Sequence, residues 1–311
     1  MNLRTILPAL VLTMSVFTAN AQEPLGEMIE RGLSIARSQS LAMARSLENQ
    51  NDLFPKTFEN GKLVTCRYQW WVSGFFPGVL WQLYGDSRDN ELRRYAELFT
   101  DRVEPVKKMT DTHDLGFMLY CSFGQGYHLT GNPRYLDIIK EGTESLLTRY
   151  DRKLGVIKSW ESGPKWKYPV IIDNMMNLEM LCFMAGETGR HYYENVARSH
   201  ANTTMANHFR DDCSTYHVVS YDPETGRPHA RQTAQGYSDE SAWARGQAWG
   251  LYGYTMMYRE TLDRNYLEQA RRIAGFICNH PNLPEDGIPY WDFNAPDIPS
   301  AYRDASAGAI M

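Results

Sequence analysis

The stretch IIDNMMNLEMLCF (171–183) is apolar on almost every side, although it carries the carboxylate of Asp173 and the amides of Asn174 and Asn177. A helix that is apolar all round is enclosed by other helices, whereas a helix with a single apolar stripe faces water. We therefore expect this segment to be an inner helix of an all-α protein. Its acid needs an explanation, because a buried carboxylate is costly unless it is paired or stays protonated.

Three further segments share this enclosed character, and amphipathic stretches separate them. The enclosed segments are FFPGVLWQLY (75–84), LGFMLYCSF (115–123) and ARGQAWGLYGYTMMY (244–258). The amphipathic stretches (129–150, 187–209 and 261–280) each begin with a turn and a tyrosine, namely Tyr135, Tyr193 and Tyr266. This alternation predicts an inner and an outer ring, which is an α/α toroid of helical hairpins. An irregular helical bundle is the alternative on the pattern alone.

Strand signals are few, and we expect small β-hairpins at one rim of the toroid. LGVIKSW (154–160) favours a strand, and YHVVSYDPETGRP (216–228) holds a hairpin turn. At the C-terminus, RDASAGAIM (303–311) reads as the opening of another helix, which Asp304 or Ser306 is able to cap. We therefore expect the toroid to be C-terminally incomplete, so that these 311 residues alone fold poorly or expose an apolar face.

The N-terminus has the pattern of a secretory signal peptide. Arg4 precedes an apolar stretch (6–17), and Ala19-Asn20-Ala21 matches a cleavage site. We expect residues 1–21 to be removed, leaving 22–311 as one domain without a membrane span. The mature protein is then exported, either to the periplasm or to the medium.

Composition narrows the classes of partner and site. The chain of 311 residues is 43% hydrophobic with a formal net charge of -5, and it has no basic block of the kind that binds nucleic acid. Its five cysteines are scattered and form no CxxC pair, which argues against a zinc site or a disulfide framework. The 8 Trp and 19 Tyr are typical of sugar-handling proteins, but also of ordinary cores.

Two acids begin enclosed segments. Asp114 in DTHDLGFMLYCSF (111–123) either interacts favourably with the helix dipole, just after a capping residue, or faces a functional site. Asp173 either caps a helix that starts at Asn174 or faces a functional site. Two helices that each bring one Asp to the centre of a toroid form a carboxylate pair, in which one pKa is raised. Such a pair with aromatic walls is the general plan of a glycosidase.

The stretch QGYSDESAWARGQAW (235–249) carries residue types that bind sugars. It offers an amide for hydroxyl groups, rings for stacking and a guanidinium fork for a carboxylate or sulfate: Gln235, Trp243, Trp249 and Arg245. The two tryptophans are six residues apart and so do not share a helix face, which leaves one of them as a candidate core residue. Trp71 in WWVSGFFPGVLW (70–81) is either a stacking ring or part of the core.

In these motifs the chain resembles glycoside hydrolase family 88, the unsaturated glucuronyl hydrolases. HDLGF, IIDNMMN, STYHVVSYDPETG and above all QGYSDESAWARGQAW carry the resemblance, which runs from Trp70 to Ser306. It implies a single (α/α)6 glycosidase domain. It also implies removal of the non-reducing-end 4,5-unsaturated uronic acid from glycosaminoglycan-type oligosaccharides that lyases release, without a cofactor or metal.

The resemblance also implies roles for individual residues. Asp173 is the general acid/base, which protonates C4 so that water adds at C5, and Asp114 assists it. Positions that line the uronate site or its wall fall on His217, Gln235, Trp243, Arg245, Trp249 and Trp71.

Three other functions remain open at this stage. The nearest is an unsaturated rhamnogalacturonyl hydrolase acting on pectin fragments, although QAW after WARG favours the glucuronyl family. A sugar epimerase or isomerase would use paired histidines, which the spacing here does not supply. A non-catalytic glycan-binding protein would keep the aromatic wall without turnover.

Overall fold

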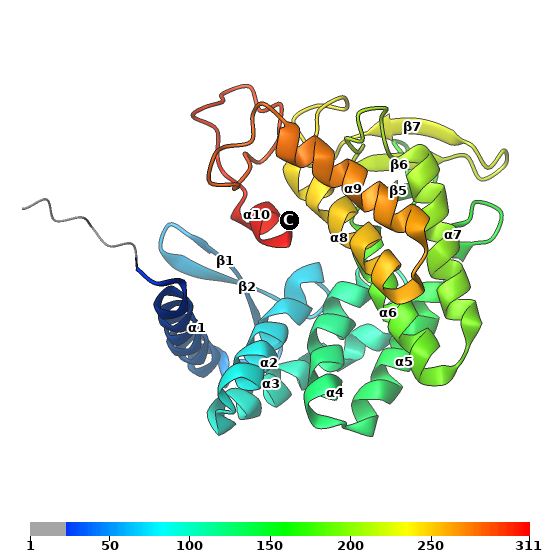
Figure 1. Cartoon of the computed structure of the whole chain (residues 1–311). Coiled ribbons are helices and arrows are strands. Elements are labelled where there is room, and N and C mark those ends of the chain that lie inside the picture. The colour runs from blue at the N-terminus through cyan, green and yellow to red at the C-terminus, as the bar shows by residue number, and fades with distance from the viewer. Residues whose placement is uncertain (1–22) are drawn as a thin grey trace, which may run out of the picture.

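The computed structural model describes residues 23–311 (Figure 1), and the predicted signal peptide lies outside these residues. The helices are α1 (Leu25–Leu47), α2 (Phe75–Ser87), α3 (Asn90–Val103), α4 (Gln125–Thr130), α5 (Pro133–Leu147), α6 (Asn174–Thr188), α7 (His191–Asn207), α8 (Ala244–Thr261), α9 (Arg264–Asn279) and α10 (Ala305–Ile310). Two 3₁₀ segments, η1 (Trp71–Gly74) and η2 (Glu104–Lys108), and the π-helix η3 (Gly116–Gly124) complete the helical part.

The helices form successive hairpins of one inner and one outer element. In these hairpins α2 packs on α3, η3 on α5, α6 on α7 and α8 on α9, while α2, η3, α6, α8 and α10 follow one another as inner neighbours. Figure 1 shows this progression from cyan α2 through green and yellow to red α10. The predicted all-α toroid of helical hairpins is confirmed.

The outer helices repeat one local design. Tyr135, Tyr193 and Tyr266 are each the third residue of their helix, and each is buried at the hairpin interface. The side chains of Asn132 and Asp263 cap α5 and α9 by accepting a backbone N–H two residues later. The tyrosines thus anchor one face of the outer ring, while the opposite face is exposed to solvent, as the amphipathic pattern predicts.

The strands are short: β1 (Phe54–Glu59), β2 (Lys62–Cys66), β3 (Tyr150–Asp151), β4 (Val156–Ile157), β5 (Pro169–Ile171), β6 (Val218–Tyr221) and β7 (Pro228–Gln232). Strands β5, β6 and β7 form an antiparallel sheet, and β6–β7 is the predicted hairpin. The strand expected over 154–160 is shorter than predicted. Sequence analysis missed the β1–β2 hairpin, whose Asn60-Gly61 turn adopts the left-handed backbone typical of such a pair.

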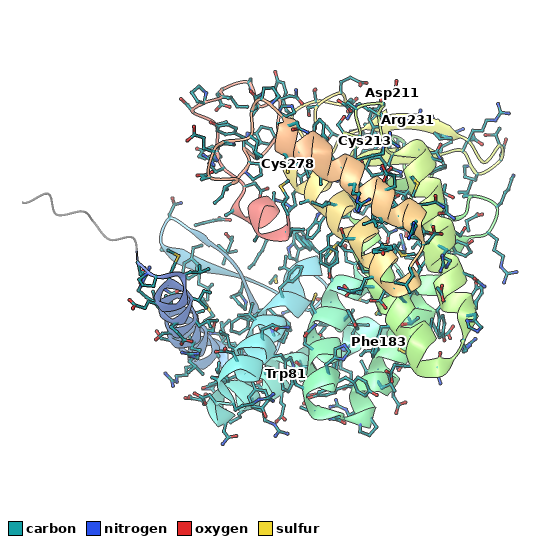
Figure 2. The ribbon with its side chains drawn as sticks, in the orientation of Figure 1. Trp81, Phe183, Asp211, Cys213, Arg231 and Cys278 are labelled. Atoms are coloured by element: carbon teal, nitrogen blue, oxygen red, sulfur yellow. The ribbon has the colours of Figure 1, made fainter. Side chains whose placement is uncertain are left out.

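Large aromatic side chains fill the space between the rings. Trp81 of α2 (labelled in Figure 2) is fully buried, and its indole N–H donates to the Thr100 hydroxyl of α3 at 2.8 Å. All five cysteines are free thiols. Within residues 23–311, no helix combines the length and the apolar character that crossing a bilayer requires.

Candidate active site

A cavity of about 280 Å³ opens where several inner elements begin. Asp173 directly precedes α6, Asp114 lies just before η3, Trp71 starts the turn into α2, and Arg245 is the second residue of α8. All four line the cavity together with Gln235. Residues scattered over 175 positions of the sequence therefore meet at one rim because their helices all start there.

Asp173 is the most strongly perturbed acid of the site. It occupies the position before α6 where a capping side chain would bond to the helix, but its carboxyl group makes no such bond. The side chain is buried, and burial raises its pKa to about 7, with the nearby negative charge of Asp114 as the second cause. The capping alternative for Asp173 is therefore wrong, and at pH 7 about half of the carboxyl groups still carry a proton.

The two residues that precede Asp114 fix the orientation of its carboxylate. The Thr112 hydroxyl donates to its Oδ2 at 2.9 Å and accepts its backbone N–H at 3.1 Å. The Nε2 atom of His113, a fully buried ring, lies 3.3 Å from Oδ1. Burial lowers the pKa of His113, so this ring is neutral at pH 7. Asp114 is the more accessible of the two acids and lines the cavity with a fixed orientation.

The two acids meet because α6 and η3 touch at their first turns. The side-chain oxygen of Asn177, four residues after Asp173, accepts the backbone N–H of Phe117 at 3.0 Å. A Cβ atom at Gly116 would lie 2.7 Å from both the Cα and the Oδ1 of Asn177, so only glycine permits this approach. Asp173 and Asn177, which are four residues apart, thus have two functions: Asp173 enters the cavity, and Asn177 joins the helices.

We expect Gly116→Ala to lower the free energy of unfolding by about 1–3 kcal/mol, because the added methyl collides with backbone that cannot move alone. The matched control is Gly186→Ala in α6, where an added Cβ meets nothing within 4 Å. That control is expected to be neutral or stabilising by about 0.5–1 kcal/mol, since alanine favours a helix. Urea denaturation of both variants measures the difference, and equal stabilities would contradict the contact.

His217 and Trp243 lie behind Asp173. The His217 ring is 3% exposed, packs 4.5 Å from the Trp243 ring, and brings its Nε2 to 3.7 Å from Asp173 Oδ2. Its Nδ1 accepts the backbone N–H groups of Ala234 and Gln235 at 3.0 and 3.2 Å. His217 was predicted to line the substrate site, but the structure places it against the acid, one layer behind the cavity wall.

Arg245 links the cavity to the last helix. Its guanidinium donates to Gln235 Oε1 at 3.2 Å and to Asp304 Oδ2 at 2.7 Å, and it lies 4.7 Å above the Trp243 ring. Asp304 caps α10 through the N–H of Ala307, which confirms one of the two predicted caps. The fork expected to hold an anion is therefore already oriented by an amide, a ring and a carboxylate.

Trp71 and Trp249 belong to an aromatic cluster around Phe117. The Phe117 ring is 5.7 Å from Trp71 and 5.2 Å from Trp249, whose side chain is largely buried. Trp243 belongs to the same cluster. The sequence analysis placed Trp243 and Trp249 on different faces of one helix. That argument does not apply, because Trp243 precedes α8 and is not part of the helix. Trp71 alone of these three predicted tryptophans reaches the cavity surface.

Sequence analysis missed three aromatic lining residues. Trp70, Phe117 and Trp160 contribute to the cavity wall. Trp70 adjoins the predicted Trp71, and Phe117 falls three residues after Asp114, so both could have been found by proximity to residues already chosen. Trp160 follows β4 in a loop, and only its place near the end of a predicted strand signals it.

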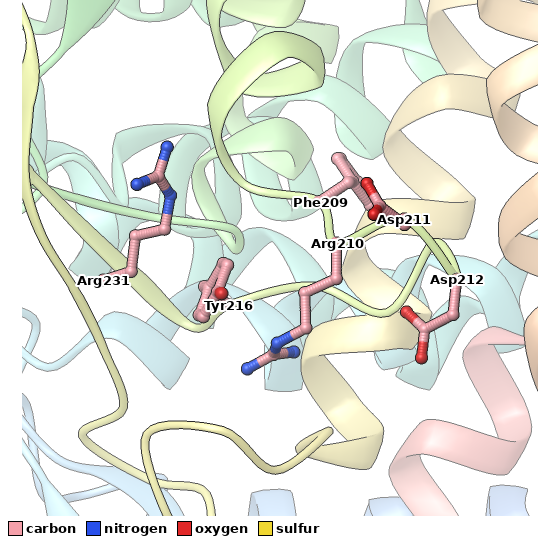
Figure 3. Close-up of a pocket in the computed structure, with 6 residues that line it drawn as sticks. All are labelled: Phe209, Arg210, Asp211, Asp212, Tyr216 and Arg231. Atoms are coloured by element: carbon pink, nitrogen blue, oxygen red, sulfur yellow. The ribbon is translucent and has the colours of Figure 1, made fainter.

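A second, larger pocket does not bring together acids from two separate helical elements. Phe209, Arg210, Asp211, Asp212, Tyr216 and Arg231 line its volume of about 520 Å³ (Figure 3). Arg210 lies 3.8 Å above the Tyr216 ring and donates to the Ser214 hydroxyl and to the Asp239 carbonyl, while Asp212 accepts from Ser214. These groups are committed to holding their own loop, so the cavity at Asp173 remains the candidate active site.

Comparison with known proteins agrees with this geometry. The family model for Glycosyl Hydrolase Family 88 matches residues 46–276, which include both acids and the Arg245 segment. The chain belongs to glycosyl hydrolase family 88. As a family 88 protein, it is 47% identical over 243 residues to an unsaturated glucuronyl hydrolase of Formosa agariphila, covering 78% of this chain and 61% of that protein. It thus spans about three fifths of the length of that relative.

Two further relatives extend the family 88 comparison. An unsaturated chondroitin disaccharide hydrolase of Streptococcus pneumoniae is 36% identical over 277 residues, covering 86% of this chain and 69% of that protein. The crystal structure of an unsaturated glucuronyl hydrolase specific for heparin superposes with a TM-score of 0.85 at 44% identity, covering 90% of this chain and 76% of that one.

Proposed function

We propose that this family 88 chain is a glycosidase that removes the non-reducing-end 4,5-unsaturated uronic acid from lyase-generated glycosaminoglycan oligosaccharides. The observation that carries the proposal is a buried Asp173, whose pKa is raised to about 7, and a second acid, Asp114, in one aromatic-walled cavity. Ordinary glycoside hydrolysis protonates the glycosidic oxygen, whereas a vinyl ether is protonated on carbon. A single acid with a pKa near 7 suits that step at neutral pH.

In the proposed reaction Asp173 transfers its proton to C4 of the unsaturated ring. Positive charge develops at C5 and the ring oxygen, and water adds at C5 while the Asp173 carboxylate takes up the proton that the water loses. The resulting hemiketal opens and expels the remaining sugar. Asp114 has two roles here: its charge keeps Asp173 protonated before the step, and it offers acceptors to the hydroxyl groups of the sugar.

The substrate's carboxylate has a matching environment. Arg245 offers a guanidinium fork at the rim, and Gln235 offers an amide beside it. The N-termini of α6 and α8 lie at the same rim without a capping side chain, and the positive end of a helix dipole favours an anion. Trp71 and Trp160 supply flat apolar surface for the sugar ring.

The named relatives support the glycosaminoglycan assignment over pectin. One is a chondroitin disaccharide hydrolase, one solved structure is described as specific for heparin, and another, from Streptococcus agalactiae, is a complex with dGlcA-GalNAc6S at 30% identity. An unsaturated rhamnogalacturonyl hydrolase or a non-catalytic glycan-binding protein is the alternative outcome of the test below.

Absorbance of the conjugated double bond over time tests the function, with unsaturated disaccharides from chondroitin, hyaluronan, heparin and pectin lyase digests. We expect loss of absorbance with at least one glycosaminoglycan disaccharide. Loss only with the pectin product would identify the rhamnogalacturonyl activity. Binding by calorimetry without loss of absorbance would identify a glycan-binding protein.

We also propose that the protein is exported after cleavage behind Ala21. The support is the positive start, apolar stretch and Ala-x-Ala pattern of the first 21 residues. N-terminal sequencing of the protein from the periplasm or medium of an expressing bacterium is expected to begin at Gln22. Full-length protein confined to the cytoplasm would contradict export.

A further inference from the structure

We propose that His217 is a positioning residue for the catalytic proton: its fixed tautomer donates toward Oδ2 of Asp173 and thereby directs the acid proton to Oδ1. The proposal rests on the function proposed above, in which Asp173 is the proton donor. It assigns to His217 a partner within the protein in place of the substrate contact expected from the sequence.

The tautomer follows from the hydrogen bonds of the ring. Nδ1 accepts two backbone N–H groups, those of Ala234 and Gln235, and therefore carries no hydrogen. Burial lowers the pKa of His217 to about 3, so the ring is neutral and its one hydrogen resides on Nε2. Trp243 against one side and Trp160 at 6.0 Å keep the ring from turning.

The Nε2–H group of His217 has a nearby acceptor in the Asp173 carboxyl group. Nε2 of His217 and Oδ2 of Asp173 are both fully shielded from solvent, both lack a hydrogen-bond partner, and lie 3.7 Å apart. A small closing movement converts this pair into a hydrogen bond, and the negative charge that appears on Asp173 after proton transfer favours that movement. An N–H directed at Oδ2 also disfavours a proton on that oxygen, which leaves the proton on Oδ1.

Other charged groups act on Asp173 without making this choice. Asp114, ahead of η3, raises its pKa, while Arg245 and the Trp249 indole, both on α8, lower it. His113 is neutral and directed at Asp114. His217 places a donor hydrogen against the enclosed oxygen, and the buried Trp249 indole N–H is a second donor near the same carboxyl group. Because Oδ2 is sealed, Oδ1 is the oxygen that can reach a sugar in the cavity.

Two amide substitutions separate the two functions of the ring. In His217→Asn the side-chain oxygen can replace Nδ1 and hold the turn at Ala234 and Gln235, but nothing replaces Nε2. In His217→Gln the amide NH₂ can replace Nε2 and donate to Asp173, while the acceptor for the turn is lost. The control is His229→Gln on the exposed face of β7, for which unchanged kinetics are expected.

For His217→Asn we expect kcat to fall roughly 10- to 100-fold at nearly constant KM, because a charge-assisted hydrogen bond to the conjugate base is lost. The alkaline limb of its pH–rate profile should move to higher pH, since the carboxylate loses a stabilising donor. His217→Gln should restore most of kcat and the wild-type limb, with a raised KM. Equal losses in both variants, or an unshifted limb in His217→Asn, would overturn the proposal.

A second readout does not require turnover. In ¹⁵N-histidine-labelled protein, His217 should show a hydrogen-free Nδ1 and a protonated Nε2, assigned by the signal that disappears in His217→Asn. A hydrogen on Nδ1 would overturn the tautomer and the proposal with it. If no disaccharide is consumed, the proposed function fails by the absorbance assay, while the nitrogen spectrum still decides the state of His217.

Discussion

Replacing Asp173 by asparagine is expected to lower kcat by a factor of roughly 100 or more, with little change in KM. The amide is close in size and keeps the packing behind the cavity, but it has no acidic proton to place on carbon. The absorbance assay with the best glycosaminoglycan disaccharide measures both constants.

A matched control for this prediction is Asp137→Asn, which makes the same chemical change on the solvent-facing side of outer helix α5. It should leave both constants unchanged. Circular dichroism of the two variants checks that the fold is intact. Turnover by Asp173→Asn within a few-fold of the wild-type rate would remove this residue from the mechanism and would leave Asp114 as the candidate acid.

Acidification is expected to destabilise the folded protein steeply below pH 6.5. Burial lowers the pKa of His200 to about 3, of His208 to about 4 and of His217 to about 3. The unfolded chain binds protons at these residues from about pH 6.5 downward, whereas the folded chain does not. Asp173 acts in the opposite direction, because its pKa of about 7 lets the folded state hold a proton that the unfolded state releases.

On unfolding near pH 5, the three histidines take up protons and Asp173 releases one, so the net uptake is about two protons. The free energy of unfolding therefore falls by ~2.7 kcal/mol per pH unit as the pH is lowered. Urea denaturation at pH 7.5, 6.5, 5.5 and 5.0 measures the slope. His191→Gln, at the exposed start of α7, should not alter it. An unfolding free energy that is constant between pH 6.5 and 5 would show that the buried rings accept protons while folded.

Helical periodicity predicted the fold because the burial of a helix constrains the sequence of that helix itself. A segment that must be enclosed, such as 75–84 or 244–258, has to be apolar on every side wherever its neighbours lie in the sequence. The β1–β2 hairpin was missed although its Asn60-Gly61 turn is a strong local signal. The π-helical winding of η3 could not have been predicted, since its apolar run fits an α-helix equally well.

The site was predictable in its acids and less so in its supporting contacts. Asp114 and Asp173 stand out because each interrupts an enclosed segment. The function of Asn177 depends on where η3 crosses α6, and the inward placement of His217 depends on how β6 meets the turn before α8. Both depend on tertiary contacts, which cannot be predicted from the spacing of residues within one helix or strand.

The meeting of helix starts at the cavity bears on how a charged sugar approaches. At low ionic strength the formal net charge of -5 repels an anionic disaccharide, whereas at about 0.1 M salt this repulsion is largely screened beyond about 10 Å. Closer in, the positive ends of the α6 and α8 dipoles lie beside Arg245, whose charge Asp304 offsets at 2.7 Å, in a partly buried setting where screening is weak. Moderate salt therefore removes the repulsion at a distance and preserves the attraction at contact. For the proposed substrate, the position of these positive groups therefore matters more than the overall negative charge.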